Sequence, residues 1–311
     1  MHAYRESDVP VQTGKTILVT GANTGIGYET ARVLAERGAR VLLGCRSEEK
    51  AERAISRIKS IKSDANVTWV PLDLANLKSI KEAAAIVNEE ERLDVLINNA
   101  GVMTPPKLAT DDGFELQFGV NHLGHFALTG HLIRKLKDRP GARIVTLSSL
   151  AHRGVFPFLP QVLSGSIEWD DVHAHKKYNR LIRYNMSKFA NILFTYELQR
   201  KLEHAGSSAI SVAAHPGICL TELLRYIPRS LVFISTPLMR ALNFPPEGAL
   251  PTLLAATGQD VHGGDYYGPT RMGELKYSAH KVDAASAAKN EGQAKKLWDL
   301  STELTSVEYA L

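Results

Sequence analysis

The sequence contains only two cysteines among its 311 residues. We expect Cys45, on a predicted core strand, to lie far from Cys219, so a disulfide framework is not expected and a reducing compartment is the default. Residues 1–14 are polar and lack the apolar run of a signal peptide or membrane anchor. These absences predict a cytoplasmic protein without a transmembrane segment, in which residues 1–14 form a polar extension.

The chain also lacks a concentrated charge of one sign. Its formal net charge is +4, and the Lys and Arg residues are spread along the sequence, so no nucleic-acid-binding surface is predicted. It shows no internal repeat and no low-complexity segment. A hydrophobic content of 44% in a chain of this length is typical of one α/β domain, here covering residues 1–311.

A glycine-rich turn stands near the start of the chain. Residues 15–27 place a short β-branched run before three glycines, Gly21, Gly25 and Gly27, and a helical pattern over 28–37 follows. A strand, a glycine turn and a helix start direct backbone N–H groups and the positive end of a helix toward a phosphate. An ordinary turn that needs glycine for its positive φ is the alternative. The spacing G-x-x-x-G-x-G differs from the G-x-G-x-x-G fingerprint.

Tyr184 and Lys188 are four residues apart in a predicted helix, which places the phenol and the ammonium on one face. The ordinary pKa of a phenol is about 10. A neighbouring positive charge is expected to lower this pKa, as general acid–base chemistry near neutral pH requires. By itself such a pair is more often a surface feature.

Strands alternate with helices along the chain, which predicts a single-domain, doubly wound, parallel Rossmann-type sheet with helices on both faces. The predicted strands cover residues 16–20, 40–44, 67–71, 95–98, 143–147 and 211–215, with a last one around Tyr266 and a closing helix near 284–304. Two segments, 151–183 and 219–246, do not fit this alternation. Long irregular segments are usually functional, and the apolar segment 219–246 is predicted to be a substrate lid, although it could instead be a dimer surface or a membrane-associated segment.

The end of the second predicted strand indicates the cofactor. NAD-binding sheets commonly place an acid there for the ribose 2′-hydroxyl, whereas NADP requires a cation for the 2′-phosphate. This chain has Arg46 and Ser47 at that position and no acid. The guanidinium can pair with a phosphate, so the sequence favours NADP(H). A solvated arginine at a strand end is the alternative.

Five motifs together resemble the short-chain dehydrogenase/reductase family. They are residues 20–27, the run Asn98-Asn99-Ala100-Gly101, Ser148-Ser149, Tyr184-x-x-x-Lys188 and Pro216-Gly217. Their order and spacing are specific, and the similarity runs from about residue 15 to 267. Residues 120–126, 148–152 and 187–194 resemble the retinol dehydrogenase and WW-domain oxidoreductase branch, whose membrane-bound retinol dehydrogenases generally carry an N-terminal anchor that residues 1–14 lack.

The resemblance implies the catalytic roles. In the family a serine binds the carbonyl, a tyrosine gives the proton, a lysine lowers the pKa of the tyrosine and holds the nicotinamide ribose, and an asparagine orients a relay water. The matching residues here are Ser149, Tyr184, Lys188 and Asn121. Ser149 is chosen over Ser148 because the family uses the second serine of such a pair. Asn121 could otherwise be a helix-interior residue that bonds the neighbouring backbone.

The resemblance also implies a set of cofactor contacts. Asp73 matches the adenine-binding acid of the family, with a helix cap as its alternative role. The implied contacts are Gly21, Asn23, Thr24, Gly25, Ile26, Gly27, Arg46, Ser47, Asp73, Leu74, Asn99, Ala100, Gly101, Tyr184, Lys188, Pro216, Gly217, Ile218 and Thr221.

The predicted function is NADP(H)-dependent interconversion of a carbonyl and an alcohol on a lipophilic small molecule, by a possible homo-oligomer. Two alternatives remain: a protochlorophyllide-type C=C reductase and a non-catalytic NADP(H) sensor. The histidine pairs 122/125 and 173/175 could suggest a metal, but no third ligand stands at a suitable spacing and the family needs none, so no metal site is predicted.

Overall fold

The computed structural model describes residues 4–154, 165–219, 243–271 and 273–311. Eight strands form one sheet in the order β3-β2-β1-β4-β5-β6-β7-β8. β1 to β7 run parallel, and β8 pairs antiparallel with β7. The strands are β1 (Thr16–Thr20), β2 (Arg40–Cys45), β3 (Val67–Pro71), β4 (Val95–Asn98), β5 (Arg143–Leu147), β6 (Ile210–Ala214), β7 (Tyr266–Arg271) and β8 (Lys276–Lys281).

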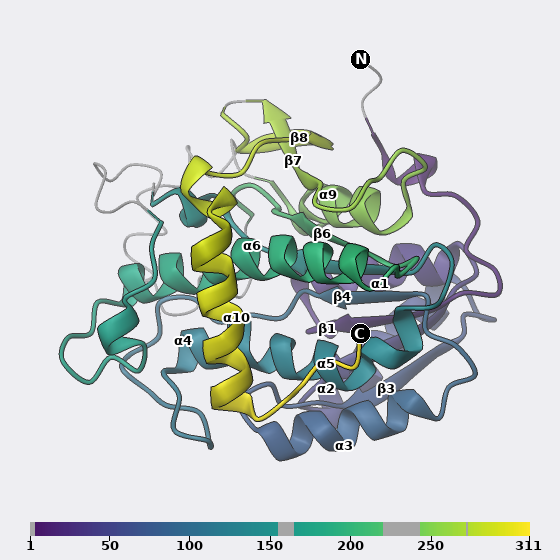
Figure 1. Cartoon of the computed structure of the whole chain (residues 1–311). Coiled ribbons are helices and arrows are strands. Elements are labelled where there is room, and N and C mark those ends of the chain that lie inside the picture. Colours follow the sequence, from purple (N-terminus) through teal and green to yellow (C-terminus); the bar gives the residue numbers. More distant parts are fainter. Residues whose placement is uncertain (1–3, 155–164, 220–242, 272) are drawn as a thin grey trace.

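Helices cover both faces of the sheet, so the predicted doubly wound fold is confirmed (Figure 1). One face carries α1 (Gly25–Glu36), α2 (Glu48–Ile61) and α9 (Pro245–Thr257). The other carries α3 (Leu77–Asn88), α5 (Gly124–Leu136) and α6 (Arg180–His204), with α10 (Glu291–Thr305) outside them. Ile17 and Val19 of β1 face the first layer and Leu18 the second, as the alternation of side chains along a strand requires.

The element boundaries differ from the predictions in several places. α1 begins at Gly25 rather than at residue 28, because Thr24 is extended and acts as its N-cap residue. β2 ends at Cys45, and β6 lies one residue earlier than expected. α10 begins only at Glu291, since residues 286–289 form a separate 3₁₀ turn.

β8 was not predicted. It is a polar edge strand containing Lys276, His280 and Lys281, and its pairing with β7 is interrupted between Pro269 and Arg271. An edge strand that buries few apolar side chains leaves only a weak pattern in the sequence.

The segment predicted to be a lid lies largely outside the described residues. At its ends, Cys219 and Asn243 form a parallel bridge. Pro245 and Pro246 stand in the first turn of α9, where a missing backbone N–H costs no helical hydrogen bond. The segment predicted to be a lid, 219–246, therefore ends inside the first turn of a helix. In the described part of the chain, none of the helices is long and apolar enough to span a bilayer.

Candidate functional site

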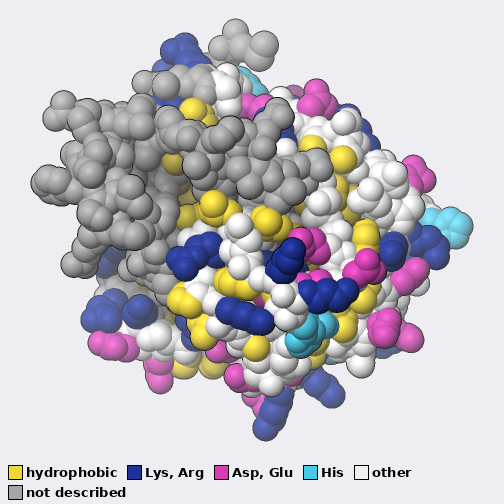
Figure 2. Space-filling model, turned by 90° about the vertical axis from the view of Figure 1, so that its left-hand side faces the viewer, with side chains coloured by type: hydrophobic (Ala, Val, Ile, Leu, Met, Phe, Trp, Pro, Cys, Tyr) yellow, Lys and Arg dark blue, Asp and Glu magenta, His cyan; other side chains and the backbone are white. Residues whose placement is uncertain are grey.

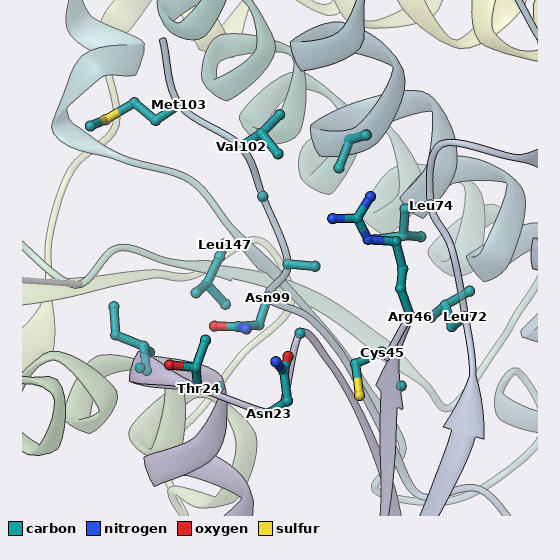
Figure 3. A pocket seen from close by; sticks show the side chains of 18 of the residues that line it. Asn23, Thr24, Cys45, Arg46, Leu72, Leu74, Asn99, Val102, Met103 and Leu147 are labelled. Atoms are coloured by element: carbon teal, nitrogen blue, oxygen red, sulfur yellow. The ribbon is translucent and has the colours of Figure 1, made fainter. Parts of the chain in front are cut away.

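The carboxyl ends of the parallel strands border one cavity of about 430 Å³. Its walls come from the turns after β1 to β4, from the ends of β5 and β6, and from α6. The strand order reverses between β1 and β4, and such a switch point is where open α/β sheets bind ligands. Figure 3 shows side chains from several of these turns converging on the cavity.

The glycine turn forms the floor of this cavity. Gly21 has a φ of +67°, and a side chain there would also press on Ala100, 3.0 Å from its Cα. A Cβ on Gly27 would overlap the carbonyl oxygen of Gly21 and lie 2.5 Å from Nδ2 of Asn99. Glycine is required at both positions because backbone approaches backbone closely there.

The first turn of α1 faces the cavity with its backbone N–H groups available. Among the described residues, the Thr24 side chain accepts no capping hydrogen bond, and the turn contains no acid. Thr24, Gly25, Ile26 and Gly27 all line the cavity. Open backbone donors at a positive helix end, beside two glycines where no Cβ fits, suit the diphosphate of a dinucleotide. We call the glycine turn together with the first turn of α1 the cradle.

The turns after β2 and β3 place charged side chains beside the cavity. Arg46, Ser47 and Asp73 line it, and Nη1 of Arg46 lies 3.8 Å from Oδ2 of Asp73. Lys50 also lines it, and its backbone N–H donates to Oγ of Ser47 at 3.3 Å. The sequence interpretation missed Lys50, although its place one turn after Arg46 could have indicated it.

Asp73 does not cap the helix that follows it. Oδ1 of Asp73 accepts a hydrogen bond from the N–H of Ala75 at 2.9 Å, whereas Asn76 caps α3 by accepting from the N–H of Ser79. The alternative role considered for Asp73 is therefore wrong. Leu74 joins Asp73 in lining the cavity.

The turn after β4 forms the opposite wall. Asn99, Ala100 and Gly101 line the cavity, and Nδ2 of Asn99 donates to the carbonyl of Thr20 at 2.7 Å. A Cβ on Gly101 would lie 3.1 Å from Oδ1 of Asn121 and 3.6 Å from Nζ of Lys188. This turn therefore brings the dinucleotide cradle next to the predicted catalytic residues.

Asn121 lies in a short π-helical turn, Gly119–Leu123, a rare geometry that is frequent at functional sites. Its Oδ1 accepts from the N–H of Val102 at 2.8 Å, and its Nδ2 donates to the carbonyl of Val102 at 3.0 Å and to Oγ of Ser187 at 2.9 Å. The side chain thus bonds neighbouring backbone, as its alternative role predicts. The relay-water role stays a prediction.

Tyr184 and Lys188 stand on one face of α6 and both line the cavity. Nζ of Lys188 lies 5.9 Å from the centre of the Tyr184 ring and donates to the carbonyl of Leu147 at 3.1 Å. Burial raises the pKa of Tyr184 to about 12, opposed by a hydrogen bond with Ser149, and lowers the pKa of Lys188 to about 8. The pKa of the phenol is therefore raised in this arrangement rather than lowered as expected, because burial outweighs the hydrogen bond with Ser149.

The two serines after β5 have different environments. Oγ of Ser148 donates to the carbonyl of Lys188 at 2.8 Å, and Ser148 lines the cavity. Ser149 caps the short 3₁₀ turn Leu150–Arg153, and its side chain hydrogen-bonds with Tyr184. The contact with the phenol favours Ser149 as the serine of the site.

The turn after β6 is only partly described. Pro216 lines the cavity. Gly217 has a φ of +71° and packs beneath the carbonyl oxygen of Leu275, to which the N–H of Ile218 donates at 3.3 Å. Gly217 and Ile218 are thus held by the β7–β8 turn, and Thr221 lies outside the described residues.

The structure adds residues to the site that sequence reasoning missed. Gly44, Cys45, Leu72, Val102, Met103, Leu108, Leu116, Val120 and Leu147 also line the cavity. Most are apolar and stand at or after strand ends, so no local pattern separates them from core residues. The two histidine pairs make other contacts: His122 binds Ser301, His125 binds Thr20, and the rings of His173 and His175 lie 5.7 Å apart.

Known proteins are similar to this chain in sequence and in fold. A family model described as short chain dehydrogenase matches residues 15–161. Retinol dehydrogenase 13 of Homo sapiens is 45% identical over 302 residues, covering 95% of this chain and 86% of that protein. Retinol dehydrogenase 12 of Mus musculus is 40% identical, covering 95% and 88%. The chain belongs to the short-chain dehydrogenase family.

Within this family the chain is an oxidoreductase of the retinol dehydrogenase branch. A crystal structure of an uncharacterized protein from Mycobacterium Paratuberculosis is 37% identical and has a TM-score of 0.80, with full coverage of both chains. This family binds a nicotinamide cofactor, which makes the cavity at the carboxyl ends of the strands the candidate cofactor site.

Gly27→Ala tests the cradle. We expect the added methyl group to displace the glycine turn and weaken cofactor binding by about tenfold or more, since overpacking against backbone typically costs about 1–3 kcal/mol. Titration of intrinsic and nicotinamide fluorescence with NADPH and NADH measures this. Gly292→Ala in α10, where the Cβ meets only Asn290 at 3.4 Å, is the control. Equal affinities in the two variants would show that Gly27 does not shape the site.

Proposed function

We propose that this short-chain dehydrogenase interconverts a carbonyl and an alcohol on a lipophilic small molecule, using NADP(H), in the cytoplasm. One observation carries the proposal: a single cavity joins the open N-terminus of α1 to the side chains of Tyr184 and Lys188. A dinucleotide whose phosphates lie at the glycine turn can therefore extend to the two residues capable of proton chemistry.

The cofactor preference rests on the charges at the adenosine end of the cavity. Arg46, with 64% of its side chain exposed, Ser47 and Lys50 stand where an acid would bind the 2′-hydroxyl of NAD. Two cations and a hydroxyl suit a 2′-phosphate. Asp73 lies close enough to Arg46 to orient the guanidinium.

The chemistry follows from the protonation states of the site. A nicotinamide held in this cavity would supply or accept the hydride. Hydride addition to a carbonyl leaves negative charge on oxygen, which must be stabilised and protonated. Tyr184 keeps its proton at neutral pH because its pKa is about 12, so the phenol can donate that proton. Ser149, in contact with the phenol, is suited to bind the same oxygen, and Lys188 supplies positive charge nearby.

The substrate proposal rests on the relatives and the sequence. Several relatives carry the name retinol dehydrogenase, and this chain has an apolar run over 223–242, directly after the predicted cofactor contacts at 216–221. A retinoid-like or long-chain aldehyde fits both observations.

Tyr184→Phe tests the reaction. We expect turnover to fall by about 10²- to 10⁴-fold, the usual contribution of general acid–base catalysis, with NADPH affinity nearly unchanged. The assay follows nicotinamide absorbance with a panel of aldehydes that includes retinal. Tyr196→Phe, farther along α6, removes a hydroxyl away from the cavity and should leave turnover intact. Near-normal turnover in the Tyr184 variant would refute the assignment.

Arg46→Asp tests the cofactor preference. We expect NADPH affinity to fall by about tenfold or more, because a charge-assisted contact is lost and a like charge faces the phosphate, while NADH affinity changes little. Arg53→Asp on α2 is the matched control, since its side chain is also 64% exposed but pairs with Glu49. Equal wild-type affinities for NADPH and NADH would contradict the proposal.

A series of n-alkyl aldehydes tests the substrate class. Catalytic efficiency should rise with each added methylene until the pocket is filled, by up to about 0.8 kcal/mol per buried CH₂. Replacing Phe233 and Leu238 by serine should flatten the rise while sparing NADPH affinity. Efficiency that does not depend on chain length in the wild type would argue against a lipophilic substrate.

A further inference from the structure

The buried hydroxyl of Thr20, at the end of β1, joins the glycine turn to the turn after β4. Oγ1 of Thr20 accepts hydrogen bonds from the N–H groups of Asn99 and Ala100, each at 2.9 Å. These two bonds use both lone pairs of the oxygen, so the hydroxyl proton must point elsewhere. The nearest acceptor is Nε2 of His125, at 2.9 Å, whereas the carbonyl of Ile97 is 3.4 Å away.

This arrangement determines the tautomer of His125. If Nε2 accepts from Thr20, the proton of the neutral ring is on Nδ1, which then donates to the carbonyl of Asn121 at 3.0 Å. The ring is 1% exposed, and burial together with the charge of Lys188 lowers its pKa to about 4. A neutral imidazole therefore links a hydroxyl of β1 to a carbonyl of the π-helical turn.

This chain of hydrogen bonds continues to α6, the helix that carries Tyr184 and Lys188. Asn121 donates to Oγ of Ser187, and Ser187 donates to the carbonyl of Tyr184 at 2.8 Å. The same asparagine bonds both backbone groups of Val102, which itself lines the cavity. His125 thus stands between the residues that shape the cofactor cradle and those that carry the proposed acid–base chemistry.

We propose that His125 is a positioning residue that holds the Asn99–Ala100 turn and the Asn121 turn in their cofactor-binding arrangement. This inference rests on the proposed function, which supplies NADP(H) as the cofactor that the two turns bind. His125 itself does not line the cavity, and it acts through Thr20 and Asn121. Without the imidazole, the Thr20 hydroxyl keeps only the more distant carbonyl of Ile97, and the Asn121 carbonyl loses the Nδ1 donor of His125. The two turns then become free to shift against each other.

His122 provides a matched control. It lies three residues earlier, is also 1% exposed, and has a pKa lowered by burial to about 3. Its Nε2 lies 2.8 Å from Oγ of Ser301, on α10 and away from the cavity. Replacing either histidine by phenylalanine removes one buried imidazole and its hydrogen bonds.

The first experiment compares His125→Phe with His122→Phe. We expect NADPH affinity to fall about tenfold in the His125 variant and less than twofold in the His122 variant, even where both lower the melting temperature. Hydrogen exchange of residues 95–104 without cofactor should be faster only in the His125 variant. Equal affinity and equal exchange in the two variants would overturn the inference.

The second experiment uses Thr20. Thr20→Ser keeps the hydroxyl and should retain NADPH affinity, whereas Thr20→Val should weaken it. If the hydroxyl and the imidazole form one link, Thr20→Val combined with His125→Phe binds NADPH no more weakly than Thr20→Val alone. Fully additive losses would show that the two act separately and would overturn the inference. Failure of the wild type to bind either nucleotide would instead refute the proposed function, while the exchange comparison would still test the link.

Discussion

The parallel pairing of β1 with β4 is the constraint on which the rest of the site depends. In the order β3-β2-β1-β4, the chain after β1 leaves for one face of the sheet as α1, and the chain after β4 leads to the other face. The two turns separate and leave a crevice, which Asn99 and Thr20 hold at a defined width. Glycine at positions 21 and 27 follows from this close approach of backbones.

Burial sets the chemistry of the side chains that border the crevice. Desolvation penalises the charged form of every group, so Tyr184 keeps its proton, His125 stays neutral and Lys188 gives up its proton more readily than an exposed lysine. Each of these groups is also held by a hydrogen bond to a neighbour. Protonation and position are therefore determined together, by the packing of α5 and α6 against the sheet.

The charges on the outer surface are distributed differently from those that line the cavity. Figure 2 shows Lys, Arg, Asp and Glu side chains interspersed on the described part of one face, with small hydrophobic areas between them. Interspersed charges of both signs create no extended field of one sign on this part of the surface. The distinctive chemistry of this chain lies in the cavity, where Arg46 and Lys50 provide a local excess of positive charge.

The sequence by itself determined the elements whose signals are local. Buried parallel strands such as β1 and β4 appear as short β-branched runs, the glycine spacing indicates a phosphate turn, and an i, i+4 pair on a helix places Tyr184 and Lys188 together. Tertiary structure decided what depends on partners distant in the chain. Lys50, Val102 and Leu147 line the cavity because of how turns meet, the edge strand β8 depends on β7, and the pKa of Tyr184 depends on how deeply it is buried. The link through His125 joins residues 20, 99 and 121, and no pattern within a short window of sequence encodes a contact that only the folded sheet creates.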